Sequence, residues 1–181
     1  NLTGANLTRA NLTRANLTDA ILEDANLTGA NLASANLTRA NLTRTDLTGT
    51  NLTGANLNGV ISWHIVGVPA AFPSGHYELI SGHLVGPRVD LEGADLAGMD
   101  LTGTDLAGTN LLGARLQRAD LSRANLTHAN LTRANLTGAG LEDANLTRAD
   151  LSNARVEGAF GRGANLTGAN LTRANLSGAN L

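Results

Sequence analysis

The leucines of this chain recur at intervals of five residues, beginning with Leu2, Leu7 and Leu12. On an α-helix each residue turns by about 100°, so a step of five moves a side chain by about 140° and no apolar stripe forms. On a strand, an odd step places successive leucines on opposite faces. Because neither regular element gathers these leucines on one side, we predict that the chain turns once in every repeat.

The repeats fall into two blocks. Leucine-type centres occupy every fifth position through residues 2–57 and 91–181, with departures at Val156 and Gly161. The intervening stretch has no repeat and holds most of the few aromatic residues. We therefore predict a single domain over residues 1–181 with three parts. These are repeat coils in 1–62, a non-repeating insertion in 63–88 and further coils in 89–181.

The sequence of one repeat predicts which side chains point inward. Ala5 and Leu7 are two residues apart, so a short extended segment directs both to the same side and Asn6 to the other. Thr8 and Arg9 then form the corner, where glycine often replaces Arg9. Each repeat thus contributes an inward Ala and Leu, and successive coils bury these side chains against one another.

The pattern A-[N/D]-L-x-x resembles the pentapeptide repeat family. Representative copies are ANLTR at 10–14, ADLAG at 94–98 and ADLSR at 119–123. The resemblance implies an all-β fold, a right-handed quadrilateral β-helix with four pentapeptides in each coil. It further implies about eight coils in a chain of this length, interrupted by one inserted β-hairpin or loop.

A coil of four pentapeptides would place each residue beside the one that follows it by four repeats. At the outward corner position, opposite charges then become neighbours: Asp19 with Arg39, Asp24 with Arg44, and Arg123 with Asp143. Each exposed pair should contribute a few tenths of a kcal/mol. Asp100 beside Asp120 runs against this trend. Asparagines also form columns, such as Asn31 beside Asn51, for which we predict side-chain amide ladders.

The insertion contains the run HYELISGHLVG at 76–86, which is typical of a β-hairpin turning at Ser81-Gly82. Its aromatic and histidine side chains form a candidate partner-binding patch. The six candidates are Trp63, His64, Phe72, His76, Tyr77 and His83. The alternative is that these aromatic residues pack the insertion onto the coils.

Metal and catalytic sites are not indicated. The three histidines of the insertion and Glu78 have no spacing typical of a metal site, so we predict no metal and no cofactor. Asp90, Asp95, Asp100 and Asp105 would lie one on each face of a coil, so their carboxylates cannot converge. No nucleophile–base arrangement and no phosphate-binding loop is recognisable. We therefore predict that the protein is not an enzyme.

Charge and composition restrict the partners. The formal net charge is −2, from 15 acidic residues and 13 arginines, which argues against a specific nucleic-acid partner. No membrane span is apparent. The chain has no cysteine, so its redox compartment cannot be read; a bacterial, cytoplasmic protein is favoured. Asn-Leu-Thr also matches the N-glycosylation acceptor, but here it arises from the repeat itself.

The leading functional prediction is a non-enzymatic structural or protein-interaction module with an unidentified protein partner. Self-association is a further expectation, through the hairpin or end to end, because no cap is visible at either terminus. One alternative comes from the resemblance, since relatives similar to the quinolone-resistance factors mimic DNA and bind DNA gyrase. Those relatives have phenylalanine at many repeat centres and a strong negative charge, both of which this chain lacks.

A second alternative is binding to ice or another regular surface through columns of threonine. Thr8, Thr28 and Thr48 would form such a column. Neighbouring columns are broken by Glu23 and Ala33, and charged residues crowd the same faces. This function is therefore less favoured than protein interaction.

Overall fold

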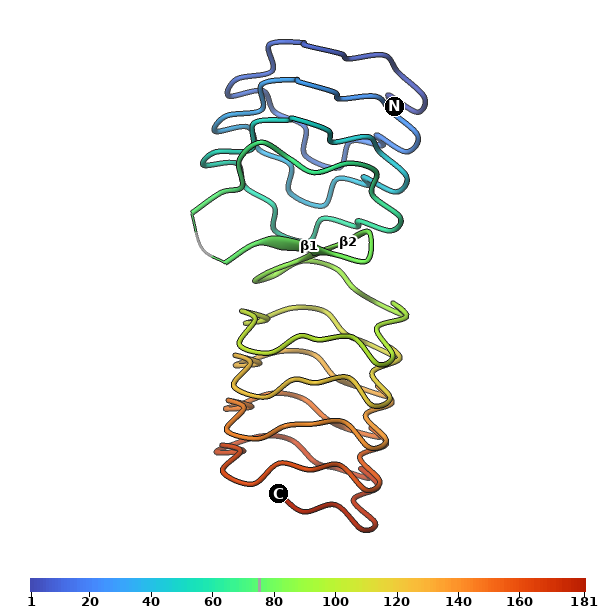
Figure 1. Cartoon of the computed structure of the whole chain (residues 1–181), viewed down its shortest axis with the longest axis vertical. Helices are drawn as coiled ribbons and strands as arrows, with labels where there is room; N and C mark the ends of the chain where they lie inside the picture. Colours follow the sequence, from blue (N-terminus) through green and yellow to red (C-terminus); the bar gives the residue numbers. More distant parts are fainter. Residues whose placement is uncertain (75) are drawn as a thin grey trace. The chain divides into compact units, whose positions relative to one another are not determined.

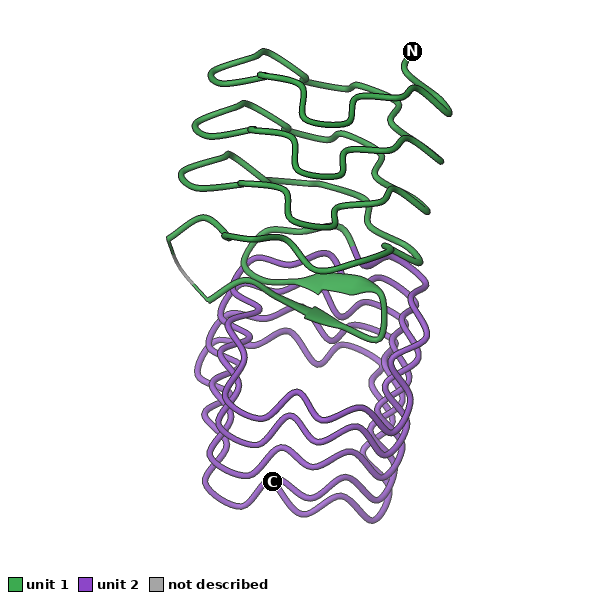
Figure 2. Ribbon diagram, turned by 45° about the horizontal axis from the view of Figure 1, so that its top comes forward, with its two compact units in different colours: residues 1–90 green, residues 91–181 purple. Residues whose placement is uncertain are grey.

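The computed structural model describes residues 1–74 and 76–181. The chain divides into two compact units, residues 1–90 and 91–181 (Figure 2). Two strands are defined, β1 (Glu78–Ile80) and β2 (His83–Val85), both in the first unit (Figure 1). Elsewhere in the described residues, isolated parallel bridges alternate with turns. No helix in this part of the chain is long and apolar enough to cross a membrane.

Each unit is built from coils that return to the same face after four repeats. In the first unit Asn26 forms a parallel bridge with Asp46, and in the second Asn125 forms one with Asn145. A bridge occurs in every repeat of the regular coils, so one coil carries four of them. This register confirms the predicted turn in every repeat and the four-sided coil.

The backbone hydrogen bonds of one repeat show why its sequence suits this coil. In the repeat 26–30, Asn26 N donates to the preceding coil at 2.9 Å, and Leu27 N and Gly29 N donate to the following coil at 2.9 and 2.8 Å. Ala30 N donates to Leu27 O at 2.8 Å, within the turn. The remaining N–H, that of Thr28, donates to Asn26 Oδ1 at 2.9 Å. All five donors are thus satisfied, the last by the asparagine side chain.

The core consists of stacked leucine and alanine side chains, as predicted. In the interior coils the leucines have no exposed surface; Leu27 and Leu126 are examples. The alanines two positions before them, such as Ala25 and Ala124, are also buried. The corner residues adopt the left-handed conformation, with φ of 58° at Arg14 for example. Glycine is frequent at this position because it adopts that conformation without steric cost.

The last coil of the first unit is longer than the others. Ile61, Val66 and Ala71 bridge to Asn41, Asp46 and Asn51 in the regular register. Ile61 also bridges to Asp90, the next residue of the chain on the same face. In a regular coil the chain returns to that face after four repeats, whereas here it returns only at Asp90. Pairing with the preceding coil therefore continues well past Leu57, the last leucine centre of the first block.

Strands β1 and β2 occupy the end of this long coil. They pair antiparallel, with Leu79 opposite Leu84, and are joined by Ser81 and Gly82. Leu84 and Val85 of β2 are fully buried. Ser62, at a position that is leucine in regular coils, accepts a hydrogen bond from Leu84 N at 3.0 Å through its buried hydroxyl. The strand pair thus supplies apolar side chains to a coil that lacks its own leucines.

The second unit keeps its register through the fault at Gly161. Gly140 bridges to Phe160, and Phe160 to Asn180. Gly161 is buried at the leucine position, where a Cβ would lie 2.5 Å from Leu181 Cδ2. Phe160, the preceding residue, occupies an outward position and is 57% exposed.

Candidate interaction surface

The outward asparagines and threonines of the regular coils form side-chain hydrogen bonds with one another. The Thr38 hydroxyl donates to Asn36 Oδ1 at 2.6 Å, and the Thr127 hydroxyl donates to Asn125 Oδ1 at 2.7 Å. These asparagines were predicted to point outward and to form amide ladders between coils, but their role as acceptors within their own turn was missed. The signal was present in the Asn-x-Thr spacing, which is typical of an Asx turn.

The predicted amide ladders are found in part. Asn51 Nδ2 donates to Asn31 Oδ1 at 3.2 Å, and Asn130 Nδ2 donates to Asn110 Oδ1 at 3.1 Å. Other outward amides bond differently, as when Asn125 Nδ2 donates to Asp105 Oδ1 at 3.0 Å. The columns of outward residues are thus linked along the stacking direction by side chains as well as by backbone.

Two of the three predicted ion pairs are present. Arg39 binds Asp19 with an Nε–Oδ1 distance of 2.7 Å, and Arg44 binds Asp24 with an Nε–Oδ1 distance of 2.8 Å. Hydrogen bonds from these guanidinium groups lower the pKa of both carboxyl groups. All four side chains are about half exposed or more, so these pairs contribute little to stability.

The predicted pair between Arg123 and Asp143 is wrong. Within the described residues these two side chains form no ion pair, although they lie at neighbouring corners. Asp143 Oδ1 instead extends over Gly163 of the following coil, where a Cβ would overlap it. Exposed charges gain too little energy from pairing to fix the direction of either side chain. A further pair at the same four-repeat spacing, which was not among the three predicted, joins Arg115 Nη1 to Asp95 Oδ2 at 3.0 Å.

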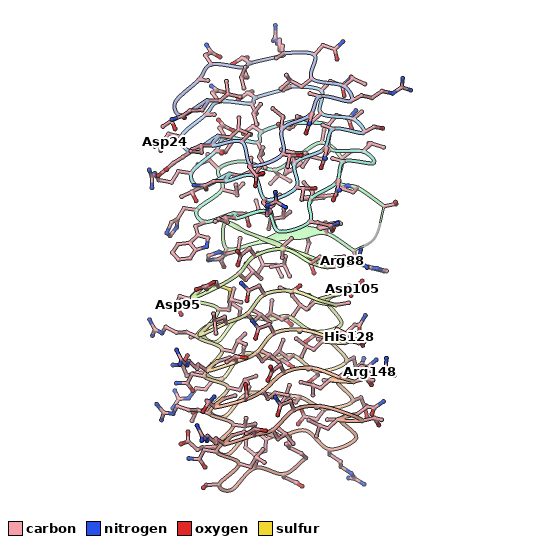
Figure 3. All side chains as sticks on the ribbon, turned by 180° about the vertical axis from the view of Figure 1, so that it is seen from behind. Asp24, Arg88, Asp95, Asp105, His128 and Arg148 are labelled. Carbon is pink, nitrogen blue, oxygen red and sulfur yellow. The ribbon has the colours of Figure 1, made fainter. Side chains whose placement is uncertain are left out.

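Corner arginines lie over glycines. A Cβ at Gly29 would lie 3.5 Å from Arg9 Cγ, and one at Gly168 would lie 3.4 Å from Arg148 Cγ. The aliphatic part of the arginine therefore runs beside the corner of the following coil, where glycine leaves room for it. Figure 3 shows Arg148 and His128, labelled, on the outer surface of the second unit.

The long coil of the first unit has a different outer surface. Trp63, Val66 and Val68 are 37%, 52% and 66% exposed. We call these three residues the Trp63 patch. Val66 bridges to Asp46, and Gly49 N donates to Val68 O at 2.9 Å, so both valines belong to the wall of the coil. The patch places apolar side chains where regular coils carry asparagine, aspartate and threonine.

The patch has a charged neighbour in the preceding coil. Arg44 N donates to Trp63 O at 2.7 Å, which places these two corners side by side. The Arg44 guanidinium binds both Glu23 and Asp24, with N–O distances of 2.7 and 2.8 Å. An apolar centre with a polar border is typical of protein-binding surfaces.

The six predicted site residues are not gathered into one patch by the described contacts. Trp63, His64 and His76 are exposed, Phe72 and Tyr77 are half-buried, and His83 is buried. The rings of His64 and His83 lie 6.2 Å apart, centroid to centroid. The Tyr77 hydroxyl donates to Pro87 O at 3.2 Å, and a Cβ at Gly86 would overlap the Tyr77 ring.

Tyr77 therefore packs the chain that follows β2, which is the alternative left open by the sequence. Val66 and Val68 were missed. Carrying the four-repeat register past Leu57 would have identified both as apolar residues at outward positions. Their role in binding stays a prediction.

The acidic residues at the start of the second unit do not converge. Figure 3 shows Asp95 and Asp105, labelled, on different sides of the coils. Across residues 1–74 and 76–181, no group of three or more His, Asp and Glu side chains is placed to hold a metal ion. Hydrogen bonds from the hydroxyls of Thr102 and Ser122 lower the pKa values of Asp100 and Asp120, respectively.

The chain is similar to known proteins both in its sequence, by a match to a family model, and in its structure, by its likeness to solved structures. A family model described as "Pentapeptide repeats" matches eight copies, in residues 1–33, 25–61, 88–123, 114–153 and 144–181. No curated protein has a sequence similar enough to match the chain. The family matches stop at the long coil and resume after it.

Three solved structures illustrate the likeness. HetL, a pentapeptide repeat protein involved in heterocyst differentiation regulation from the cyanobacterium Nostoc sp. strain PCC 7120, is 33% identical, with a TM-score of 0.51; the match covers 96% of this chain and 71% of HetL. A pentapeptide repeat protein from the thylakoid lumen of Arabidopsis thaliana is 38% identical over 51% of this chain and 68% of its own, with a TM-score of 0.42. QnrB1, a plasmid-mediated fluoroquinolone resistance protein, is 20% identical over 97% of this chain and 77% of its own, with a TM-score of 0.35.

The family model and HetL carry the assignment, because the QnrB1 likeness lies at low identity and the TM-scores of the other two structures are low. The repeat pattern, the four-repeat register and the four bridges in each coil agree with them. The chain belongs to the pentapeptide repeat family and forms its right-handed quadrilateral β-helix.

Proposed function

We propose that this protein is a non-enzymatic interaction module that binds a partner protein through the Trp63 patch. The observation that carries the proposal is the exposure of Trp63, Val66 and Val68 within a short stretch of one coil. Tryptophan is enriched among the residues that dominate binding energy, and clustered apolar exposure is typical of interaction sites.

The surroundings of the patch support the same function. The neighbouring ion pairs of Arg44 supply a polar border, and the bridges of Val66 and Ala71 hold the backbone of the patch in the coil wall. A partner would therefore meet an ordered surface and lose little conformational entropy on binding. The partner is an unidentified protein, and a second copy of this chain is one candidate.

The test compares the wild-type protein with a triple variant, Trp63→Thr, Val66→Asn and Val68→Thr. These substitutions introduce the residues that regular coils carry at the equivalent outward positions, so the fold should persist. Light scattering measures self-association, and affinity capture from the source cells measures foreign partners. The matched control is Phe160→Asn, which removes another exposed apolar side chain from the second unit.

We expect the triple variant to lose self-association or a stoichiometric partner that wild type and Phe160→Asn retain. Retention of the same assembly by the triple variant would contradict the role of the patch. Robust turnover in a hydrolase screen would contradict the non-enzymatic assignment.

A further inference from the structure

The second unit carries a surface hollow of about 490 Å³. It is lined by Ala97, Gly98, Arg115, Gln117, Arg118 and Thr137. The hollow arises because Ala97 has a small side chain and Gly98 has none, whereas Gln117 and Arg118, one coil later, have long side chains. No side-chain atom lies within 4 Å of a Cβ built at Gly98, so the space above Arg118 is open. Its volume is within the range of small-molecule sites.

Gln117, one of the residues that line the hollow, has an unsatisfied polar atom. Its Oε1 is buried and has no hydrogen-bond partner among the residues that the structure describes. Leaving a buried acceptor unpaired costs about 1–3 kcal/mol, so a ligand that donates a hydrogen bond here would recover that energy. A ligand carrying both hydroxyl donors and oxygen acceptors would satisfy the amide in either orientation of its oxygen and nitrogen.

The charges around the hollow are positive. Arg115 is paired with Asp95, whose side chain projects outward in Figure 3. Arg118 forms no ion pair with any described carboxylate. Glu157, which accepts a hydrogen bond from the lining residue Thr137 at 2.9 Å, also accepts one from Arg155 at 3.3 Å. A net positive charge with a planar guanidinium suits phosphate oxygens.

We propose that this hollow binds the phosphate monoester of a small hydroxylated molecule. The phosphate oxygens accept hydrogen bonds from Arg118 and from the free N–H groups of Arg115. A hydroxyl of the same molecule donates to Gln117 Oε1. Ala97 and Gly98 contribute by leaving space, and a bulkier side chain at either position would exclude the ligand.

Glycerol 3-phosphate is the probe, because it combines a phosphate monoester with adjacent hydroxyl groups. Titration calorimetry on the full chain at low salt should show saturable binding with one site and a Kd on the order of 1 mM or below. Arg118→Gly should weaken binding at least ~10-fold, which corresponds to about 1.4 kcal/mol. Glycine already occupies the same corner column at Gly138 and Gly158, so this variant should fold.

A second variant tests the hollow itself. Ala97→Thr introduces the residue most common at this repeat position and should abolish binding by filling the space. The matched control is Arg133→Gly, which removes another corner arginine from a column that also contains Gly113. It should bind the probe as wild type does.

Related probes separate the parts of the ligand. Inorganic phosphate should bind more weakly than glycerol 3-phosphate, and glycerol should not bind detectably. Succinate binding as tight as that of glycerol 3-phosphate would overturn the phosphate assignment. The absence of saturable binding, or an equal loss in Arg118→Gly and Arg133→Gly, would overturn the site.

Discussion

A regular coil of the second unit and the long coil at 61–89 both return to their starting face and both bury apolar side chains, but they do so with different lengths of chain and different residues. The regular coil returns to its starting face after four repeats and fills its interior with leucine and alanine. The long coil returns to its starting face only at Asp90, carries Ser62 in place of leucine and receives Leu84 and Val85 from β2. Stacking therefore requires backbone pairing and a filled interior, whereas the length of chain in one coil can change.

The outer surfaces of the two coils differ as much as their interiors. In the regular coil each outward asparagine accepts hydrogen bonds from the following turn, so sequence and local structure are coupled in every repeat. In the long coil Val66 and Val68 have no such role and are exposed. The long coil, which does not follow the repeat sequence, is thus where these apolar side chains are exposed.

The largest effect should come from a charge placed in a regular coil. Leu126→Asp buries a carboxylate without a partner in a position with no exposed surface, so we expect a loss of about 3–5 kcal/mol in the free energy of unfolding. Urea unfolding followed by circular dichroism would measure this loss. Arg133→Ala, at an exposed corner, should change the same quantity by less than about 0.5 kcal/mol. Wild-type stability in Leu126→Asp would contradict the inward assignment.

The comparison becomes sharper when the same deletion is made in both coils. Leu84→Ala in the long coil and Leu121→Ala in a regular coil both remove a side chain with no exposed surface. Each should therefore lower the free energy of unfolding by about 2–5 kcal/mol. The measurement is again urea unfolding. If Leu84→Ala is nearly neutral while Leu121→Ala is not, the strand pair is not part of the core.

A smaller loss should follow Ser62→Ala. This change leaves the buried Leu84 N–H without the hydroxyl that accepts its hydrogen bond at 3.0 Å, at a cost of about 1–3 kcal/mol. Thermal unfolding of Ser62→Ala beside Ser122→Ala, whose hydroxyl lies on the surface of a regular coil, measures the difference. Equal melting temperatures for the two variants would show that the Ser62 bond does not hold the strand pair.

The smallest expected effect on stability concerns Asp46. It forms one backbone bridge with Asn26 of a regular coil and another with Val66 of the long coil. The Thr48 hydroxyl donates to Asp46 at 2.6 Å and lowers the pKa of Asp46 below its ordinary 3.8. Because the folded-state pKa is lowered, this carboxylate contributes stability above pH 3.8 that is lost as the pH falls through the folded value.

Asp46→Asn keeps the acceptor and removes the titration. We expect near-wild-type stability at pH 7 and a smaller decline than wild type between pH 4 and about pH 2, read from melting temperatures across that range. An identical decline in both proteins would show that Asp46 is not stabilised by the turn.

The sequence predicted the regular coils because their spacing of five excludes other arrangements, and Leu27 and Ala30 are buried accordingly. The hydrogen bond from Thr28 N to Asn26 was not predicted, because the prediction rested only on the side that each residue faces and not on the Asn-x-Thr spacing that is typical of an Asx turn. Arg123 and Asp143 were correctly placed at neighbouring corners but do not pair, because exposed side chains gain too little energy to fix their direction.

The candidate site was harder to predict for a related reason. Exposure of Val66 and Val68 depends on bridges to residues 46 and 51, which continue after the repeat pattern has ended. Burial of His83 depends on where β2 lies within the coil, and nothing in the local pattern specifies that position. Tertiary pairing, rather than local sequence, decides both.

Val66 and Ala71 belong to a coil of the solenoid rather than to a loop attached to its side, and amide hydrogen exchange tests this placement most directly. Leu47 N and Leu52 N donate to Val66 and Ala71 of the long coil, both at 2.9 Å, as Leu116 N donates to Asn135 in a regular coil at 2.8 Å. We predict comparable protection at all three amides; rapid exchange at Leu47 and Leu52 beside a protected Leu116 would contradict the placement.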